Sequence, residues 1–173
     1  MRSLQAGVGL VVALALQTTL AHGLLGNRAA FDLVVIAVVY VALLWGPSAG
    51  LLAGAAAGLV QDALAGGIVG VGGLAKTLVG FLAGIAGTQF IMTGALPRLV
   101  VFFLGSVLHA GVVVGFYEVI EPRSQRASYP AIATQALLNA AIGVLVMHLV
   151  ERAPDWWHQR RLRRSSLRGA WRT

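Results

Sequence analysis

Long stretches without any charged residue constrain this sequence more than any other feature. The charge-free runs are 3–27, 33–61, 63–75, 77–97, 99–117 and 127–150. Only 11% of the residues are charged and 58% are hydrophobic, whereas about a quarter of the residues of a soluble domain are charged. Because lipid cannot satisfy an open backbone, these runs predict an all-α integral membrane protein and exclude a disordered chain or a soluble enzyme.

The lengths of these runs predict one compact bundle of six transmembrane helices in residues 1–152, with a basic tail over 153–173. The predicted spans are 4–24, 30–45, 48–64, 69–91, 98–120 and 130–151. We interpret Gly46-Pro47 as a turn between the second and third spans, and a kink in one long helix is the alternative.

The placement of Lys and Arg predicts the orientation of the chain. With six spans and both termini in the cytoplasm, nine arginines lie on the cytoplasmic side and three lie outside. A five-span alternative places Arg2 outside. Ala21-His22-Gly23 fits a signal-peptide cleavage pattern, but we expect an uncleaved first span because further spans follow.

No feature of the sequence predicts catalysis or nucleic-acid binding. The net charge of +7 is concentrated in the tail beside a span, which is typical of a cytoplasmic membrane flank. Cysteine is absent, which excludes disulfides and thiolate metal sites. We find no phosphate-binding loop, nucleophile motif or metal-ligand spacing, so we expect no enzymatic activity, no cofactor and no metal.

Glycines recur at every fourth position in the third predicted span. They are Gly46, Gly50, Gly54 and Gly58, and Gly80 and Gly84 repeat the spacing in the fourth span. Small residues at this spacing let two helix backbones approach closely in lipid. The pattern therefore predicts helix packing within this chain or, as the alternative, a face that receives a helix of another protein.

Two charges at membrane depth are the next most informative residues. Asp62 lies near the end of the third span and Lys76 lies about two turns into the fourth. A buried ionisable group needs a partner or water, so we expect an ion pair across this hairpin, which Asp32 could join. The pair is interpreted as a structural clamp, with a proton or ion path or a polar docking site as alternatives.

Other polar residues in the spans are interpreted as hydrogen-bonded core groups. His109 lies near the middle of the fifth span without the spacing of a metal site. Gln135 and Asn139 are four residues apart in the sixth span and share a face, so we expect hydrogen bonds between helices from both amides.

The tail combines aromatic and basic residues. These are Trp156, Trp157, Arg160, Arg161, Arg163 and Arg164. The tryptophans fit the membrane interface, and the arginines are expected to attract anionic lipid headgroups and to fix the topology. A dock for an acidic cytoplasmic partner is the alternative.

Several of these motifs together resemble the family of the rod shape-determining protein MreD. The motifs are Asp32 at the start of a span, Gly46-Pro47-x-x-Gly50, Gly58-Leu59-Val60-Gln61-Asp62, the run from Gly72 to Gly84, and Pro97-Arg98. The resemblance is most specific over residues 46–84 and weak in the first and sixth spans and in the tail.

The resemblance implies a non-enzymatic scaffold in the bacterial cytoplasmic membrane that helps to organise lateral-wall peptidoglycan synthesis. The implied partners are MreC, the filament protein MreB, the glycosyltransferase RodA and a class B penicillin-binding transpeptidase. It also implies a fold similar to the substrate-binding subunits of energy-coupling-factor vitamin transporters. Such a transport subunit and a small proton-coupled permease are the alternative functions, although the first span lacks the Ala-x-x-x-Ala pattern of those subunits.

Overall fold

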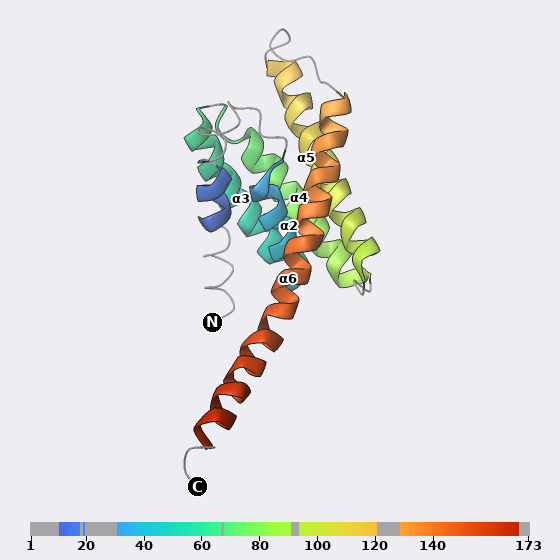
Figure 1. The fold of residues 1–173 in the computed structure, drawn as a ribbon. Helices are drawn as coiled ribbons and strands as arrows, with labels where there is room; N and C mark the ends of the chain where they lie inside the picture. The colour runs from blue at the N-terminus through green and yellow to red at the C-terminus, as the bar shows by residue number, and fades with distance from the viewer. Residues whose placement is uncertain are drawn as a thin grey trace.

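The protein is described by a computed structural model that covers residues 11–17, 19, 31–66, 68–90, 94–120 and 129–169, with side chains described up to residue 152. All regular structure in these ranges is helical, as predicted, and these ranges contain no strand. The helices are α2 (Leu33–Trp45), α3 (Pro47–Ala65), α4 (Val71–Gln89), α5 (Ala95–Ile120) and α6 (Tyr129–Gly169), and they run alternately up and down (Figure 1). Residues 11–17 of the first predicted span are also helical.

Four helices are long and apolar enough to cross a membrane. They are α3, α4, α5 and the Tyr129–Arg152 part of α6. In contrast, α2 has 13 residues and begins at Leu33 rather than at residue 30. At 1.5 Å per residue it is about 20 Å long, shorter than the hydrocarbon core of about 30 Å. Most of the predicted span 4–24 lies outside the described residues, so the number of spans stays a prediction.

The break between α2 and α3 is a tight turn rather than a kink. Gly46 has a positive φ of 85°, which a residue with a side chain rarely adopts, and Pro47 occupies the first turn of α3. The Gly46 N–H donates to the Ala42 carbonyl over 2.8 Å and closes α2. The two helices then pack against each other, because the Ala42 methyl group lies beside Gly50.

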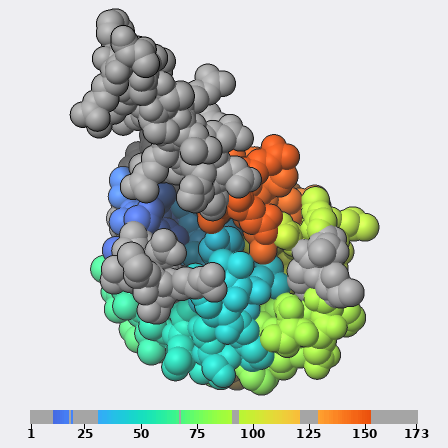
Figure 2. All heavy atoms as spheres, turned by 90° about the horizontal axis from the view of Figure 1, so that it is seen from below, coloured from blue at the N-terminus to red at the C-terminus, as the bar shows by residue number. Residues whose placement is uncertain are grey.

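The lower ends of the helices lie close together. In the space-filling view from below, the residues around the α2–α3 turn (cyan) lie next to the start of α5 (yellow-green) and the described end of α6 (orange) (Figure 2). An ion pair joins two of these ends, since Arg98 Nη1 of α5 lies 2.7 Å from Glu151 Oε2 of α6.

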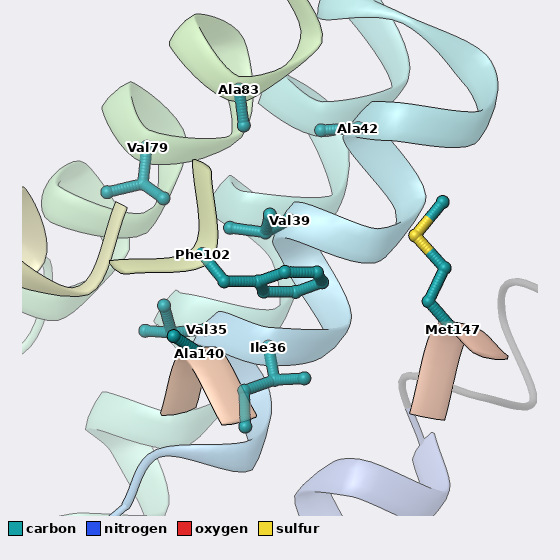
Figure 3. Close-up of a cluster of buried hydrophobic side chains, with 9 residues drawn as sticks. All are labelled: Val35, Ile36, Val39, Ala42, Val79, Ala83, Phe102, Ala140 and Met147. Carbon is teal, nitrogen blue, oxygen red and sulfur yellow. The ribbon is translucent and has the colours of Figure 1, made fainter. Parts of the chain in front are cut away.

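Phe102 is the central side chain of the main hydrophobic core (Figure 3). It extends from α5 towards α2 and α6, and only 1% of its surface is exposed. Gly143 of α6 makes room for it, because the phenyl ring fills the position that a Cβ would take there. The buried residues around it are Val35, Ile36, Val39, Ala42, Val79, Ala83, Ala140 and Met147.

Helix α6 continues beyond the end of the sixth predicted span. Helix α6 is one continuous helix of 41 residues, about 60 Å long, and its C-terminal part extends away from the other helices (Figure 1). The predicted span 130–151 therefore continues as helix into the residues predicted as a basic tail. The side chains of Trp156, Trp157 and the tail arginines lie outside the described residues, so their predicted contacts stay predictions.

Candidate functional site

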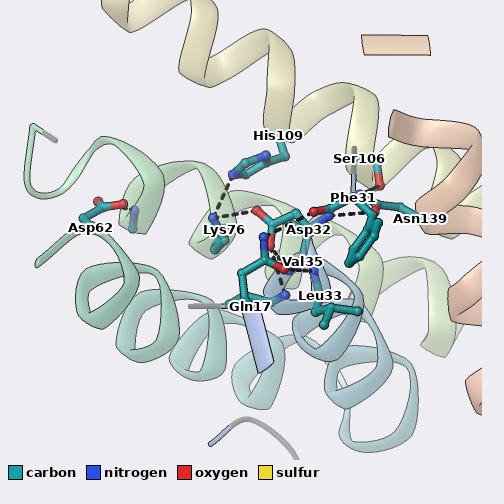
Figure 4. A network of polar contacts seen from close by, with 12 residues as sticks. Gln17, Phe31, Asp32, Leu33, Val35, Asp62, Lys76, Ser106, His109 and Asn139 are labelled. Atoms are coloured by element: carbon teal, nitrogen blue, oxygen red, sulfur yellow. Dashed lines mark hydrogen bonds and ion pairs between the residues drawn. The ribbon is translucent and has the colours of Figure 1, made fainter. Parts of the chain in front are cut away.

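The start of α2 is the centre of a buried polar network (Figure 4). Asp32 is the N-cap of α2, and its Oδ1 accepts hydrogen bonds from the N–H groups of Val34 at 2.9 Å and Val35 at 3.1 Å. The first N–H groups of a helix have no partner within the helix, and a capping carboxylate supplies one. This cap is needed here because Asp32 is only 6% exposed, so water does not reach these groups freely.

Lys76 of α4 provides the counter-charge for this carboxylate. Its Nζ lies 3.3 Å from Asp32 Oδ2, and the residue is 2% exposed. A buried ammonium is strongly unfavourable unless it is paired and hydrogen-bonded. The structure thus brings together Lys76 and Asp32, the residue that the sequence analysis named as a possible third member of the charge cluster.

His109 of α5 is the second partner of Lys76. Its Nε2 lies 2.9 Å from Lys76 Nζ. Since an ammonium only donates hydrogen bonds, Nε2 must be the acceptor, which assigns a neutral ring with its proton on Nδ1. His109 is half-buried and hydrogen-bonded to Lys76. Within the described residues, no group of three His, Asp or Glu side chains could hold a metal ion.

Asn139 connects α6 to the same helix start. The Asp32 N–H donates to Asn139 Oδ1 over 2.9 Å, and Asn139 Nδ2 donates to Ser106 Oγ over 3.0 Å. The Ser106 hydroxyl in turn donates to the Phe102 carbonyl. Gln135 is half-buried one turn before Asn139 and makes no hydrogen bond with these residues, so only one of the two predicted amides joins the network.

The N-terminal helical segment adds one more link. Gln17 Oε1 accepts from the Leu33 N–H at 2.9 Å, and Gln17 Nε2 donates to the Phe31 carbonyl at 3.2 Å. The network thus joins side chains from segment 11–17, α4, α5 and α6 to the first residues of α2.

Asp62 has a different role from the one that the sequence predicted. It makes no ion pair with Lys76, which pairs with Asp32 instead. The Asp62 Oδ2 accepts from the N–H groups of Gly70 at 2.9 Å and Gly73 at 3.0 Å. Asp62 therefore clamps the α3–α4 connection through backbone contacts, and it caps the start of α4, which has no side-chain cap of its own. The expected ion pair was wrong because Asp32, from a helix distant in sequence, lies closer to Lys76.

The glycine face of α3 is filled by α4. The position that a Cβ would take at Gly50 holds the carbonyl oxygen of Gly80, and at Gly54 it holds the carbonyl oxygen of Lys76. At Gly58, the Cα of Gly73 lies 2.6 Å from that position. The prediction of packing within the chain thus describes this face, and the alternative of an open face for another protein does not.

The glycine packing continues to the end of the α3–α4 pair. A Cβ at Gly84 would stand 2.5 Å from the Cα and the nitrogen of Pro47. Gly46 is different, since the nearest atom to its Cβ position is a Thr88 methyl carbon at 3.8 Å, and it is required for its positive φ. Gly46 therefore belongs to the turn rather than to the helix interface.

Sequence reasoning missed several residues of these contacts. Gln17 and Ser106 belong to the network, Tyr117 accepts a hydrogen bond from the Ile68 N–H at 3.4 Å, and Arg98 pairs with Glu151. Ser106 precedes His109 by three residues and so lies on the same helix face. This spacing could have indicated from the sequence that Ser106 belongs to the network. The ends of consecutive predicted spans place Arg98 and Glu151 at the same membrane surface.

Chemically, this network balances and fixes buried groups. One ammonium, one carboxylate, a neutral imidazole and two amides interact across α2, α4, α5, α6 and the helical segment 11–17. Such satisfied buried networks make an interior rigid and specify one arrangement of helices.

Comparisons with known proteins complete these observations. Residues 3–152 match the family model described as rod shape-determining protein MreD. Searches of curated proteins and of solved structures gave no match. The expected similarity to energy-coupling-factor subunits therefore stays a prediction.

Proposed function

Because the chain belongs to the MreD family of rod shape-determining membrane proteins, we propose that it is a non-enzymatic scaffold subunit of the complex that builds the lateral cell wall. The family is a family of shape-determining structural proteins of the rod-shape complex. In this role the chain binds MreC and helps to organise peptidoglycan synthesis together with MreB, RodA and a class B penicillin-binding transpeptidase.

The family match carries this proposal. It extends from residue 3 to residue 152 and so includes the buried network, the glycine interface and the membrane part of α6. The family and the four long apolar helices indicate a bacterial inner-membrane protein. We assign the C-terminus to the cytoplasm, because most of the arginines of the chain lie in the tail and at the lower ends of the helices.

The packing of the bundle supports a scaffold that is already formed before its partners bind. Backbone contacts fix α3 against α4, and the Asp32 network fixes α5 and α6 against α2. A preorganised surface binds with a smaller loss of conformational entropy than a surface that must fold on binding. A partner helix must use outer faces of the bundle, since α4 already covers the glycine face of α3.

Co-purification tests the proposal directly. The tagged full chain is isolated in mild detergent from the bacterium that encodes it, and the accompanying proteins are identified by mass spectrometry. Recovery of an MreC-like protein with cell-wall synthases supports the scaffold. Recovery of paired ATPases with a coupling subunit, and of no cell-wall protein, contradicts it and favours a transport subunit.

A pair of glycine variants separates folding from partner binding. Gly54→Leu is expected to disrupt the bundle itself, whereas nothing lies within 4 Å of a Cβ at Gly111. Gly111→Leu is therefore expected to fold normally, and its co-purified proteins report on the outer face of α5. If Gly54→Leu folded and retained every partner, the close packing of α3 on α4 would not matter for the scaffold.

A further inference from the structure

The donors around the start of α2 are those of a carboxylate-binding site (Figure 4). They are the N–H groups of Val34 and Val35 and the ammonium of Lys76, and all three bond to the side chain of Asp32. Helix N-termini and buried cations are the groups with which proteins bind free anions. At this position, the anion that they bind belongs to the chain itself.

The setting of these donors also fits a ligand position inside a membrane. Helix α2 is too short to cross the hydrocarbon core, and its first residues are buried against α4, α5 and α6. In some membrane transporters, the N-terminus of a half-helix, which is one part of a discontinuous transmembrane helix, points at an anionic substrate group near the bilayer midplane. The same kind of helix end is present here, and Asp32 occupies it.

The charges at this position balance only when a carboxylate is present. Lys76 carries a positive charge, the start of α2 carries a partial positive charge, and His109 accepts from Lys76 as a neutral ring. Asn139 and Ser106 are neutral. The carboxylate of Asp32 is the negative charge that offsets the ammonium, so its removal leaves a site that attracts a small anion.

We propose that the start of α2 and Lys76 form a carboxylate-binding position, which the side chain of Asp32 occupies in the native chain. When this side chain is removed, a free carboxylate such as acetate binds there. The side chain of aspartate beyond Cα is a carboxymethyl group, so the change Asp32→Gly removes a volume close to that of one acetate ion. In the native chain the donors are occupied by Asp32, which accounts for a buried lysine beside the start of a short helix. The inference rests on the contacts of Asp32 and stands whether or not the chain binds MreC.

Chemical rescue tests this inference on the purified full chain in detergent. Thermal unfolding of Asp32→Gly is measured while sodium acetate replaces sodium chloride at constant ionic strength. We expect a melting temperature below that of the unchanged chain and a saturable rise as acetate increases, because a ligand that binds only the folded state stabilises it. Hydrogen exchange at the amides of Val34 and Val35 is expected to slow over the same acetate concentrations.

Three matched variants show whether the rescue occurs at this position. Asp32→Asn keeps the position filled, and Asp32→Gly combined with Lys76→Met removes the ammonium, so neither is expected to respond to acetate. Glu151→Ala removes a carboxylate from the exposed ion pair with Arg98 and is likewise expected not to respond.

The proposal is overturned if folded Asp32→Gly shows no acetate dependence, or if the three control variants respond to the same extent. It is also overturned if Asp32→Gly fails to fold at every acetate concentration while the double variant folds, because a free carboxylate then does not reach the exposed ammonium. Failure of both variants to fold assigns Asp32 to the fold alone and overturns the proposal as well.

Discussion

The two interfaces of α4 are built on opposite principles. Towards α3 it presents glycines, and backbone atoms of the two helices touch directly at Gly50, Gly54 and Gly58. Towards α2 and α5 it presents Lys76, whose ammonium lies between Asp32 and His109. The first interface depends on the absence of side chains, and the second depends on matched charges and hydrogen bonds. In lipid, where apolar side chains gain little by leaving their surroundings, both are ways to hold helices together.

The difference predicts how each interface fails. A glycine contact should be sensitive to the size of a substituent and insensitive to its polarity. The polar contact should respond to a lost partner more than to lost volume, because an unpaired buried charge is the most unfavourable product of a substitution. The variants below test this contrast, from the largest expected effect to the smallest.

Gly54→Leu should have the largest effect. A side chain there meets the carbonyl oxygen of Lys76, which is backbone and cannot move aside without shifting α4. Ordinary overpacking of a core is unfavourable by about 1–3 kcal/mol, and this clash with backbone atoms, which no change of rotamer relieves, is expected to exceed the effect of the next variant. We expect loss of monodisperse protein in size-exclusion chromatography. The matched control Gly111→Leu, which points into open space, should keep its elution profile; equal behaviour of the two would contradict the contrast.

Lys76→Met should follow. It leaves the buried Asp32 carboxylate without its counter-charge, a loss of about 3–5 kcal/mol for a pair broken on one side. Adding Asp32→Asn, which removes the remaining charge, should restore part of the stability. Thermal unfolding of both single variants and the double variant measures this coupling. Strictly additive effects would show that the pair does not form.

Asn139→Ala should destabilise the chain by about 1–3 kcal/mol, because the buried Asp32 N–H and Ser106 hydroxyl lose a partner. Gln135→Ala, one turn earlier on α6, provides the comparison. It should change stability far less, since Gln135 lies outside the network. An equal loss from both variants would place Gln135 in the network after all.

Asp62→Ala should be unfavourable by about 1 kcal/mol, the usual effect of losing a helix-capping side chain. Combined with Lys76→Met, its effect should add, because the two residues share no ion pair. A strong coupling between these substitutions in thermal unfolding would restore the ion pair that the sequence predicted and overturn the assignment of Lys76 to Asp32.

Arg98→Ala should have the smallest effect. Its partner Glu151 is 45% exposed, and exposed ion pairs contribute about 0–1 kcal/mol. The melting temperature is expected to stay near that of the unchanged chain, and added salt should reduce the difference further. A loss as large as that of Lys76→Met would mean that this end of the bundle is less accessible to water than its exposure indicates.

Local patterns carried the sequence predictions that agree with the structure. The helical class followed from the apolar runs, and the packing of α3 followed from the four-residue spacing of its glycines, because both depend on neighbours within one helix. The turn at Gly46-Pro47 followed from the intrinsic conformations of these two residues.

The pairing of the charges could not be predicted in the same way. Asp32 is 44 positions from Lys76 and 107 positions from Asn139, and nothing in the sequence fixes the rotation of α2 relative to α4 and α6. Asp62 was the nearer candidate in sequence. Its carboxylate instead accepts hydrogen bonds from backbone N–H groups of the glycine-rich α3–α4 connection. Backbone donors of this kind cannot be recognised from the pattern of side chains.

Helix α6 connects the buried contacts of the bundle to the basic end of the chain through one helix. Asn139, which contacts Asp32, and Gly143, which contacts Phe102, lie in the same helix as Gly169. The rise along the helix from Asn139 to Gly169 is about 45 Å. Pro154 lies within this length and cannot donate the backbone hydrogen bond of a regular helix turn, so a pull or a torque is expected to bend the helix there first. A mechanical load applied to the basic end is therefore expected to bend α6 near Pro154 before it reaches the contacts of Asn139.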